Sequence, residues 1–269
     1  MGIDRRKFLK IAAVSAFAGA SGKVGFELLA PGDVDASVKD IPLTKANKWG
    51  MVVDMHKMTD DTLKKCQNAC HRIHNVPEWG DPRIEIKWNW NETYEHVFSE
   101  REHEYLDEHL LEKNIFVLCN HCDNPPCCRV CPTKATFKRD DGVVIMDFHR
   151  CIGCRFCMAA CPFGARSFNW RDPRKAREAC EELNPEFPTN PDYPTRTKGV
   201  VEKCNFCAER LAKGQVPACV EAANQEMEDT LIFGDLSDHG SNVRRALREH
   251  YTIRRKPELG TGPNIYYIV

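Results

Sequence analysis

The chain has almost no net charge and no long apolar run. Lys and Arg together number 38 against 39 Asp and Glu, which gives a formal net charge of -1. A general nucleic-acid binder is expected to be strongly basic, so this balance excludes that class. The uncharged stretch between Lys10 and Lys23 holds only twelve residues. A spanning helix needs about 20 apolar residues, so we predict no ordinary transmembrane helix there.

Catalytic signatures are missing as well. The sequence has no phosphate-binding loop, no Ser/His/Asp set and no paired carboxylates, so we predict no catalytic site and no small-molecule substrate. Cysteine, by contrast, is abundant, with 15 residues in 269. The count is odd and the tight C-x-x-C spacing favours shared ligation of metal centres over a disulfide framework. Structural zinc and scattered disulfides are the alternatives.

The N-terminal segment, residues 1–36, has the layout of an export signal. Residues 5–9 read Arg-Arg-Lys-Phe-Leu, and a short apolar run covers residues 11–20. Adjacent arginines followed by Phe and Leu are typical of a twin-arginine signal. We expect export by this route to the periplasmic, extracytoplasmic face of the cytoplasmic membrane. Ala30 and Ala36 are weak cleavage positions, so retention of the segment as an anchor stays open.

Two cysteine runs are complete. One reads Cys119-x2-Cys122-x4-Cys127-x3-Cys131-Pro132, and the other reads Cys151-x2-Cys154-x2-Cys157-x3-Cys161-Pro162. The latter has the spacing of bacterial ferredoxins, in which the fourth cysteine of each run ligates the other run's [4Fe–4S] cluster. This crossover rule predicts two ligand sets. The first set is Cys119, Cys122, Cys127 and Cys161, and the second set is Cys151, Cys154, Cys157 and Cys131.

Two further runs are incomplete. Cys204-x2-Cys207-x11-Cys219 has Ala223 where a fourth cysteine would stand. Cys66-x3-Cys70 matches the end of the ferredoxin run, but Met58 holds the expected first position and the segment is two residues longer. Under the crossover rule these defects remove one site and leave the other intact. We therefore predict three [4Fe–4S] clusters rather than four. The third set is Cys204, Cys207, Cys219 and Cys70, and the erased site has Met58, Cys66 and Ala223.

Three cysteines remain outside the sets. Cys128 adjoins a ligand position and is interpreted as a small buried residue, and Cys180 on a charged stretch as incidental. Cys66 is interpreted as structural, with a site completed by Asp61 or His56 as the alternative. Histidines near the motifs are interpreted as packing or capping residues, with hydrogen bonds to cluster sulfur as the alternative: His56, His71, His74, His121 and His149.

An internal repeat relates two of the runs. Residues 143–151 and residues 52–58 both show a hydrophobic strand that ends in Asp, an apolar residue, His and a basic residue. Asp141-Gly142, just before the first of these strands, predicts a hairpin turn. The repeat predicts an α+β fold of two pseudo-symmetric bacterial-ferredoxin-like modules with inserted loops.

The ferredoxin-like domain is expected over residues 48–269. Its outer module comprises residues 48–75 and 199–236, its inner module residues 115–170, its insertions residues 76–114 and 171–198, and its C-terminal extension residues 237–269. Strands are expected at residues 49–54, 84–90 and 231–233, and helices within residues 100–113, 174–183 and 241–250.

Three segments carry a family resemblance. They are residues 119–127 (Cys-Asn-His-Cys-Asp-Asn-Pro-Pro-Cys), the run at residues 151–162, and residues 203–214, which begin Lys-Cys-Asn-Phe-Cys-Ala-Glu-Arg. Over residues 48–269 the chain resembles the four-cluster ferredoxin-like subunits of membrane oxidoreductases, of the NrfC and polysulfide reductase B kind. Within that family it is most similar to the DsrO (HmeA) group of the Dsr (Hme) membrane complex of sulfate reducers. The twin-arginine signal and the ending at residues 258–269 support this choice.

The resemblance implies an electron-transfer subunit without a catalytic site of its own. Its implied partners are an NrfD-type integral membrane subunit (DsrP), a periplasmic multihaem cytochrome c (DsrJ) and the other Dsr/Hme subunits. The implied role is a relay between the membrane quinone pool and sulfur metabolism. One alternative is the same module in a nitrite, polysulfide or molybdopterin oxidoreductase complex. An alternative of another class is a zinc-stapled interaction protein.

Overall fold

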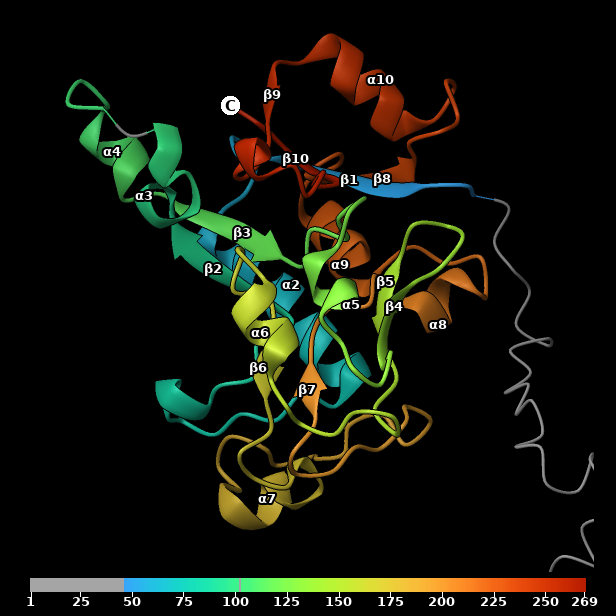
Figure 1. Cartoon of the computed structure of the whole chain (residues 1–269). Coiled ribbons are helices and arrows are strands. Elements are labelled where there is room, and N and C mark those ends of the chain that lie inside the picture. Colours follow the sequence, from blue (N-terminus) through green and yellow to red (C-terminus); the bar gives the residue numbers. More distant parts are fainter. Residues whose placement is uncertain (1–45, 102) are drawn as a thin grey trace, which may run out of the picture. The chain divides into compact units, whose positions relative to one another are not determined.

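The computed structural model of the chain describes residues 46–269 apart from residue 102 (Figure 1). The predicted twin-arginine segment lies outside the described residues. Within the described part of the chain, no helix is both long and apolar enough to cross a bilayer.

A four-stranded sheet lies in the upper part of the ribbon in Figure 1. Its strands, in spatial order, are β8 (Leu231–Asp235), β1 (Trp49–Asp54), β10 (Ile265–Ile268) and β9 (Thr252–Ile253). β10 runs parallel to β1, and the two other pairs are antiparallel. The expected strands at residues 49–54 and 231–233 are confirmed. The apolar tail adds a central strand, since β10 lies between β1 and β9.

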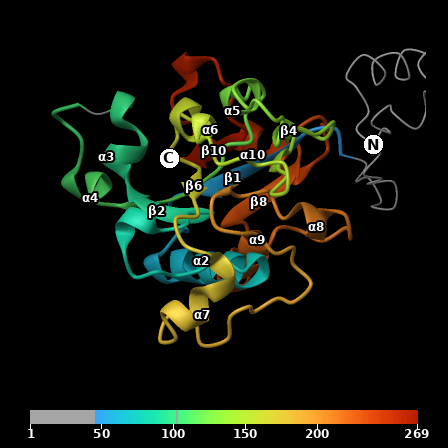
Figure 2. The ribbon, with the colours of Figure 1, turned by 60° about the horizontal axis from the view of Figure 1, so that its bottom comes forward.

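Helices cover both faces of this sheet (Figure 2). Val52 packs against α10 (Asn242–Glu249), whereas Met51 and Val53 belong to the main core on the opposite face. That opposite face is covered by α2 (Asp60–His74) and α9 (Ala218–Glu226), which pack against each other. Alternate residues of a strand point to opposite faces, which explains why one strand serves both layers.

Capping side chains set the helix boundaries. The Thr59 hydroxyl accepts the Thr62 N–H at 3.2 Å and starts α2, and Asn75 ends this helix with a left-handed conformation. The Ser241 hydroxyl accepts the Arg244 N–H at 3.3 Å and starts α10, where a helix was expected. Caps of this kind satisfy backbone N–H groups that have no partner inside the helix.

Short paired strands and single-turn helices carry the cysteine runs. The antiparallel pairs are β2 (Asn89–Thr93) with β3 (Asn114–Leu118), β4 (Thr136–Lys138) with β5 (Val144–Met146), and β6 (Ser167–Phe168) with β7 (Val201–Glu202). The helices are α5 (Pro126–Arg129), α6 (Phe156–Ala160) and α8 (Ala208–Leu211). The predicted turn at Asp141-Gly142 joins β4 to β5, and Gly142 has a φ of 82° that only glycine adopts readily.

The two copies of the sequence repeat adopt the same turn. Asp54 is the last residue of β1, and Asp147 directly follows β5. In each copy the Asp carboxylate accepts the backbone N–H groups two and three residues further on, at 2.9 and 3.3 Å. Each turn leads into the first position of a cysteine run, which is Met58 in one copy and Cys151 in the other.

Two expected elements of the first insertion are wrong. The strand expected at residues 84–90 begins only at Asn89, because Pro82 lacks an N–H and the Asp81 side chain caps a 3-10 turn over Pro82–Ile84. The helix expected within residues 100–113 is reduced to α4 (Glu108–Leu111), which Asp107 caps, after a 3-10 turn at Ser99–Arg101.

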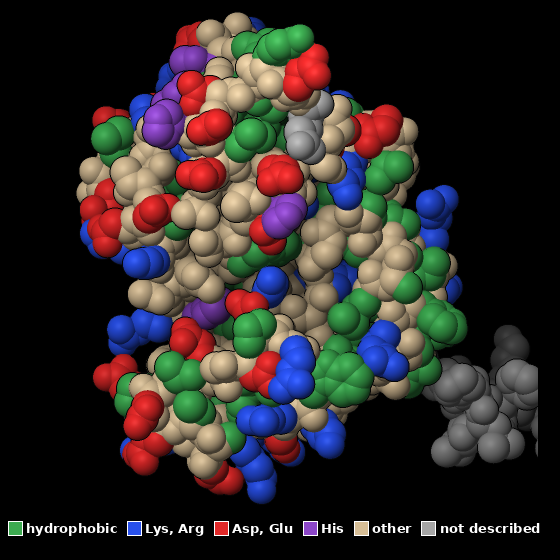
Figure 3. Space-filling model, turned by 90° about the vertical axis from the view of Figure 1, so that its left-hand side faces the viewer, with side chains coloured by type: hydrophobic (Ala, Val, Ile, Leu, Met, Phe, Trp, Pro, Cys, Tyr) green, Lys and Arg blue, Asp and Glu red, His purple; other side chains and the backbone are tan. Residues whose placement is uncertain are grey.

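Acidic and histidine side chains gather over α3 (Tyr94–Val97) and α4, at the top of Figure 3.

The second insertion matches its expectation more closely. Its short helix, expected within residues 174–183, consists of a 3-10 turn at Pro173–Lys175 followed by α7 (Ala176–Ala179). The remainder of residues 172–198 forms a loop without further helix or strand.

Candidate metal centres

The first set surrounds one cavity. Cys119 follows β3, Cys127 lies in α5, and Cys161 ends α6. These three cysteines and Cys122 all line the cavity. Burial raises the pKa of the Cys122 thiol to about 12, and the nearby sulfurs of the other three add to the rise. Because Cys161 comes from the other complete run, the chain crosses between runs to bring these four sulfurs together.

The second set reaches the surface. Cys157 is buried, Cys151 is half-buried and Cys154 is exposed. The loop turns tightly at Gly153, which has a φ of 71°, and a Cβ there would collide with the Gly199 carbonyl oxygen. Burial raises the pKa of Cys157, and the Cys151 sulfur adds to the rise, so these two sulfurs are neighbours.

Cys131, the predicted fourth ligand of the second set, directly follows the end of α5, and α5 packs against α6. Burial acts to raise the pKa of its thiol. Hydrogen bonds from the backbone of Thr136, Thr133 and Ala135 outweigh burial and lower the pKa. A lowered pKa favours the thiolate, which is the form that binds metal.

The third set comes from both ends of the domain: Cys70 of α2, Cys204 and Cys207 just before α8, and Cys219 of α9. Burial raises the pKa of Cys70 well above its usual value, and the sulfurs of the other three cysteines raise it further. The Phe206 N–H donates to the Cys204 sulfur and the Ala218 N–H to the Cys207 sulfur, both at 3.4 Å. Hydrogen bonds to sulfur are one way in which a protein tunes an iron–sulfur cluster.

The positions of the predicted erased site lie in packed apolar core. Met58, Cys66 and Ala223 are all buried in the same core cluster. The Cys66 thiol donates to the Cys219 carbonyl oxygen at 3.3 Å, and burial raises its pKa to about 12. The Cys66 thiol is thus engaged by a backbone carbonyl, and Met58 and Ala223 offer no thiolate, so these positions do not form a set of cysteine ligands.

The alternative ligands for Cys66 lie outside this core. His56 is exposed. The side chain of Asp61 is 71% exposed and pairs with Lys65 at 2.7 Å. The arrangement gives no support to a site that these two residues would complete.

Cys128 and Cys180 do not line the cavity of the first set. Cys128 is half-buried, and its thiol forms a hydrogen bond with Cys127 that lowers the pKa of Cys127 to about 5. Cys180 is half-buried at the end of α7. All fifteen cysteines lie within the described residues, and none forms a disulfide.

The three sets are neighbours in a definite order. The Cys127 sulfur of the first set contributes to the raised pKa of Cys157 in the second set. Burial is the main cause that raises the pKa of Cys204 in the third set to about 12. The nearby Cys119 sulfur of the first set adds to this rise. The first set therefore lies between the second and the third.

Buried donors without a protein partner fit an anionic, sulfur-bearing group among these sets. The Val144 N–H donates to His121 Nδ1 at 3.1 Å, so the neutral ring carries its hydrogen on Nε2, which has no partner. Burial, followed by Lys203 and Arg166, lowers the pKa of His121 well below its usual value, which keeps the ring neutral. Arg166 Nη2, in the wall of the first-set cavity, also lacks a partner. Orphaned buried donors are rare and indicate a missing acceptor.

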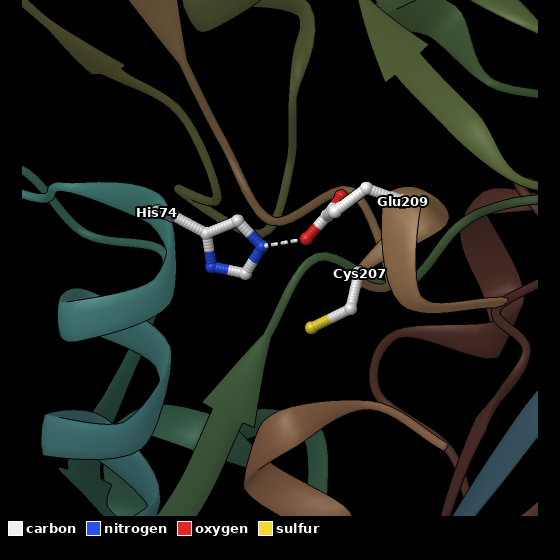
Figure 4. Close-up of side chains that lie close together, drawn as sticks. All are labelled: His74, Cys207 and Glu209. Atoms are coloured by element: carbon white, nitrogen blue, oxygen red, sulfur yellow. Dashed lines mark hydrogen bonds and ion pairs between the residues drawn. The ribbon is translucent and has the colours of Figure 1, made fainter. Parts of the chain in front are cut away.

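A histidine–glutamate pair adjoins the third set (Figure 4). His74 Nε2 donates to Glu209 Oε1 at 2.8 Å, and His74 Nδ1 lies 2.9 Å from the Cys70 carbonyl oxygen. Burial acts to raise the pKa of Glu209, but the hydrogen bond and charge of His74, together with hydrogen bonds from the Glu209 backbone and Asn205, lower it. His74, Glu209 and Cys207 lie close enough to share a metal ion. However, Cys207 also belongs to the third set, so the pair is better placed to influence that set than to hold a separate ion.

Sequence reasoning missed three charged residues at these sites. Arg166 lies five residues after Cys161, Lys203 directly precedes Cys204, and Glu209 lies within the same segment. The sequence feature that could have pointed to these residues is their position beside the cysteine motifs. Charged residues are common near loops, however, and only the structure shows that these are buried or half-buried.

Comparison with known proteins identifies the family. The 4Fe-4S dicluster domain matches residues 114–182 and again residues 171–230. The chain is 37% identical to the Hdr-like menaquinol oxidoreductase iron-sulfur subunit 1 of Archaeoglobus fulgidus, over 98% of this chain and 97% of that protein. It is 33% identical to the menaquinone reductase iron-sulfur cluster-binding subunit of Nitratidesulfovibrio vulgaris, over 82% and 88%. It is 32% identical to the NrfC homolog of Haemophilus influenzae, over 92% of each.

These matches extend along nearly the whole chain, and two dicluster segments cover both complete cysteine runs and the run at residues 204–219. The chain therefore belongs to the ferredoxin-like family of iron–sulfur subunits that contains these three relatives, and it is an electron-transfer subunit that binds 4Fe–4S clusters.

Proposed function

We propose that this subunit holds three [4Fe–4S] clusters, one on each of the three cysteine sets. The observation that carries this proposal is the meeting of Cys70 with the three cysteines near the C-terminal end, while Met58, Cys66 and Ala223 fill apolar core. A fourth cluster would need ligands where the core has apolar side chains. The matched turns after Asp54 and Asp147 support the pseudo-symmetric two-module arrangement and the outer and inner module boundaries.

When bound, a [4Fe–4S] cluster with four cysteine ligands takes up and releases one electron and offers no open position for a substrate. The protein's task is then to space and shield the ligand sets. The neighbour relations between sets support a path that runs from the second set through the first to the third. Cys154 is exposed at one end of this path, and His74 and Glu209 adjoin the other end.

We further propose that the host is a menaquinol-linked complex of the Dsr (Hme) kind. Support comes from the relative that is described as an Hdr-like menaquinol oxidoreductase subunit. The proposed partners are an NrfD-type membrane subunit (DsrP), a multihaem cytochrome c (DsrJ) and the other Dsr/Hme subunits. The twin-arginine pattern at residues 5–9 supports a periplasmic location, with a role in sulfur metabolism.

Iron and acid-labile sulfide per chain test the cluster number on anaerobically purified protein. About twelve of each are expected, four for each cluster. About sixteen would show that the Cys66 segment still holds a cluster and would overturn the count. A colourless protein that contains zinc and no labile sulfide would support the zinc-stapled alternative instead.

Purification of the native complex tests the host. Recovery with an NrfD-type membrane subunit and a multihaem cytochrome c is expected. Recovery with a molybdopterin, nitrite or polysulfide reductase would assign the same module to another complex.

A further inference from the structure

Two buried cations lie among the cysteine sets without a carboxylate partner. Arg166 is 5% exposed and Lys203 is 1% exposed. Arg166 Nη1 donates to the Thr136 hydroxyl at 2.9 Å, and Lys203 Nζ donates to the Cys204 carbonyl oxygen at 2.6 Å and to that of Val144. Within the described part of the chain, neither cation forms a salt bridge.

The two other buried cations differ in their partners. Arg196 pairs with the buried carboxylate of Glu202 at 2.7 Å. Arg255 has no salt bridge within the described residues and lies over the ring of Phe163, which lines the first-set cavity. An unpaired buried charge is strongly destabilising, whereas a paired one is tolerated. The retention of two unpaired cations beside the cysteine sets therefore requires another source of negative charge.

Each unpaired cation acts on two cysteine sets. Arg166 lines the first-set cavity, and its charge acts on Cys127 of the first set and Cys157 of the second. Lys203 directly precedes Cys204 of the third set, and its charge acts on Cys204 and also on Cys127. The two cations therefore occupy the two junctions of the path from the second set to the third.

The chemistry of the bound group explains this placement. Four thiolates leave a [4Fe–4S] cluster with a net negative charge, and reduction adds another electron. A cation in a poorly hydrated interior is weakly screened, so it stabilises the reduced form of each cluster that it adjoins.

We propose that Arg166 and Lys203 are junction cations that raise the reduction potentials of the sites on either side: the first and second for Arg166, the first and third for Lys203. This inference rests on the proposed ligand sets. The cysteine pattern alone does not predict this electrostatic role for the two positioning residues.

Redox titration followed by EPR tests the proposal on the full chain in its complex. The variants are Lys203→Met and Arg166→Gln, and Cys→Ser changes at Cys122, Cys154 and Cys207 assign the signals to the sets. Exposed Lys198→Met and Arg129→Gln are the matched charge controls.

Lys203→Met is expected to lower the reduced-to-oxidised ratio of the first and third sites at least tenfold at fixed potential, about 59 mV for one electron, and to shift the second site less. Arg166→Gln is expected to lower this ratio at the first and second sites by the same factor and to shift the third site less. Equal shifts at all sites, no shift with full iron content, or shifts no larger than those of the controls would overturn the proposal.

Charge-conserving variants separate charge from packing. If Lys203→Met or Arg166→Gln loses iron, Lys203→Arg and Arg166→Lys are expected to retain iron and near-normal potentials. Iron loss in these variants as well would show that shape matters rather than charge, and would refute the proposal. The iron content of the wild-type protein tests the proposed ligand sets independently of these variants. If the ligand sets are wrong, the wild-type protein would not hold about twelve irons.

Discussion

Two cysteines of one helix are expected to respond oppositely to the same substitution. Cys66 and Cys70 lie one turn apart in α2, and both are buried. Cys70 meets the other sulfurs of the third set, whereas Cys66 donates to a backbone carbonyl within apolar core. We predict that Cys70→Ala removes one cluster and that Cys66→Ala removes none.

The structure gives the size of each effect. Cys66→Ala deletes one fully buried sulfur and leaves a small cavity, which costs about 1–2 kcal/mol by comparison with other small deletions in protein cores. For a domain of this size, this lowers the Tm by roughly 2–8 °C, at about 2–4 °C for each kcal/mol. Cys70→Ala is expected to leave about eight irons and eight sulfides, because two of three cubane sites keep all their ligands.

The assay combines iron and labile-sulfide analysis with anaerobic thermal unfolding of both variants. Cys180→Ala, a half-buried cysteine away from the sets, is the matched control and is expected to change neither iron content nor Tm by much. Iron loss in Cys66→Ala, or full iron content in Cys70→Ala, would refute the assignment of the third set and of the erased site.

Further predictions concern the loop, the acid limit and the exposed end. Gly153→Ala is expected to destabilise the second site by about 1–3 kcal/mol, because Gly153 has a positive φ and an added Cβ would meet the Gly199 carbonyl oxygen. The variant should then hold less iron and unfold at a lower Tm than the wild type. Wild-type iron content and Tm would contradict the prediction. Although burial acts to raise the pKa of Asp123, hydrogen bonds from Lys48 and Asn264 lower it. The carboxylate therefore stabilises the fold above its unfolded pKa, and this contribution is lost as the pH falls through the lower folded pKa. Asp123→Asn is expected to make the Tm fall less steeply below about pH 4, near the ordinary Asp pKa. If the Tm of the variant falls with pH as steeply as that of the wild type, the result would count against the Lys48 contact. On exposure to air or chelator, the EPR signal lost first is expected to be that of the second site, because Cys154 is exposed; earlier loss of the third would argue against this order.

Several elements followed from local sequence. The β-strand at residues 49–54 and the helix that begins after Ser241 were predictable, because a short apolar run and a capping side chain are properties of neighbouring residues. The strand expected at residues 84–90 starts only at Asn89 for an equally local reason, since Asp81 and Pro82 form a capped 3-10 turn before it. The central place of β10 was not predictable, because its partner β1 lies more than 200 residues earlier in the chain.

The cysteine spacings alone determined the iron–sulfur chemistry and the family, because cluster ligation draws most of its ligands from short loops and therefore leaves a local signature. Only the tertiary structure decided which distant sulfurs meet, as Cys70 does with Cys204, and which cations are buried between them. The physical reason is that burial and long-range electrostatics depend on the packing of segments far apart in the chain. Arg166 and Lys203 look like ordinary loop residues until the folded chain removes them from water.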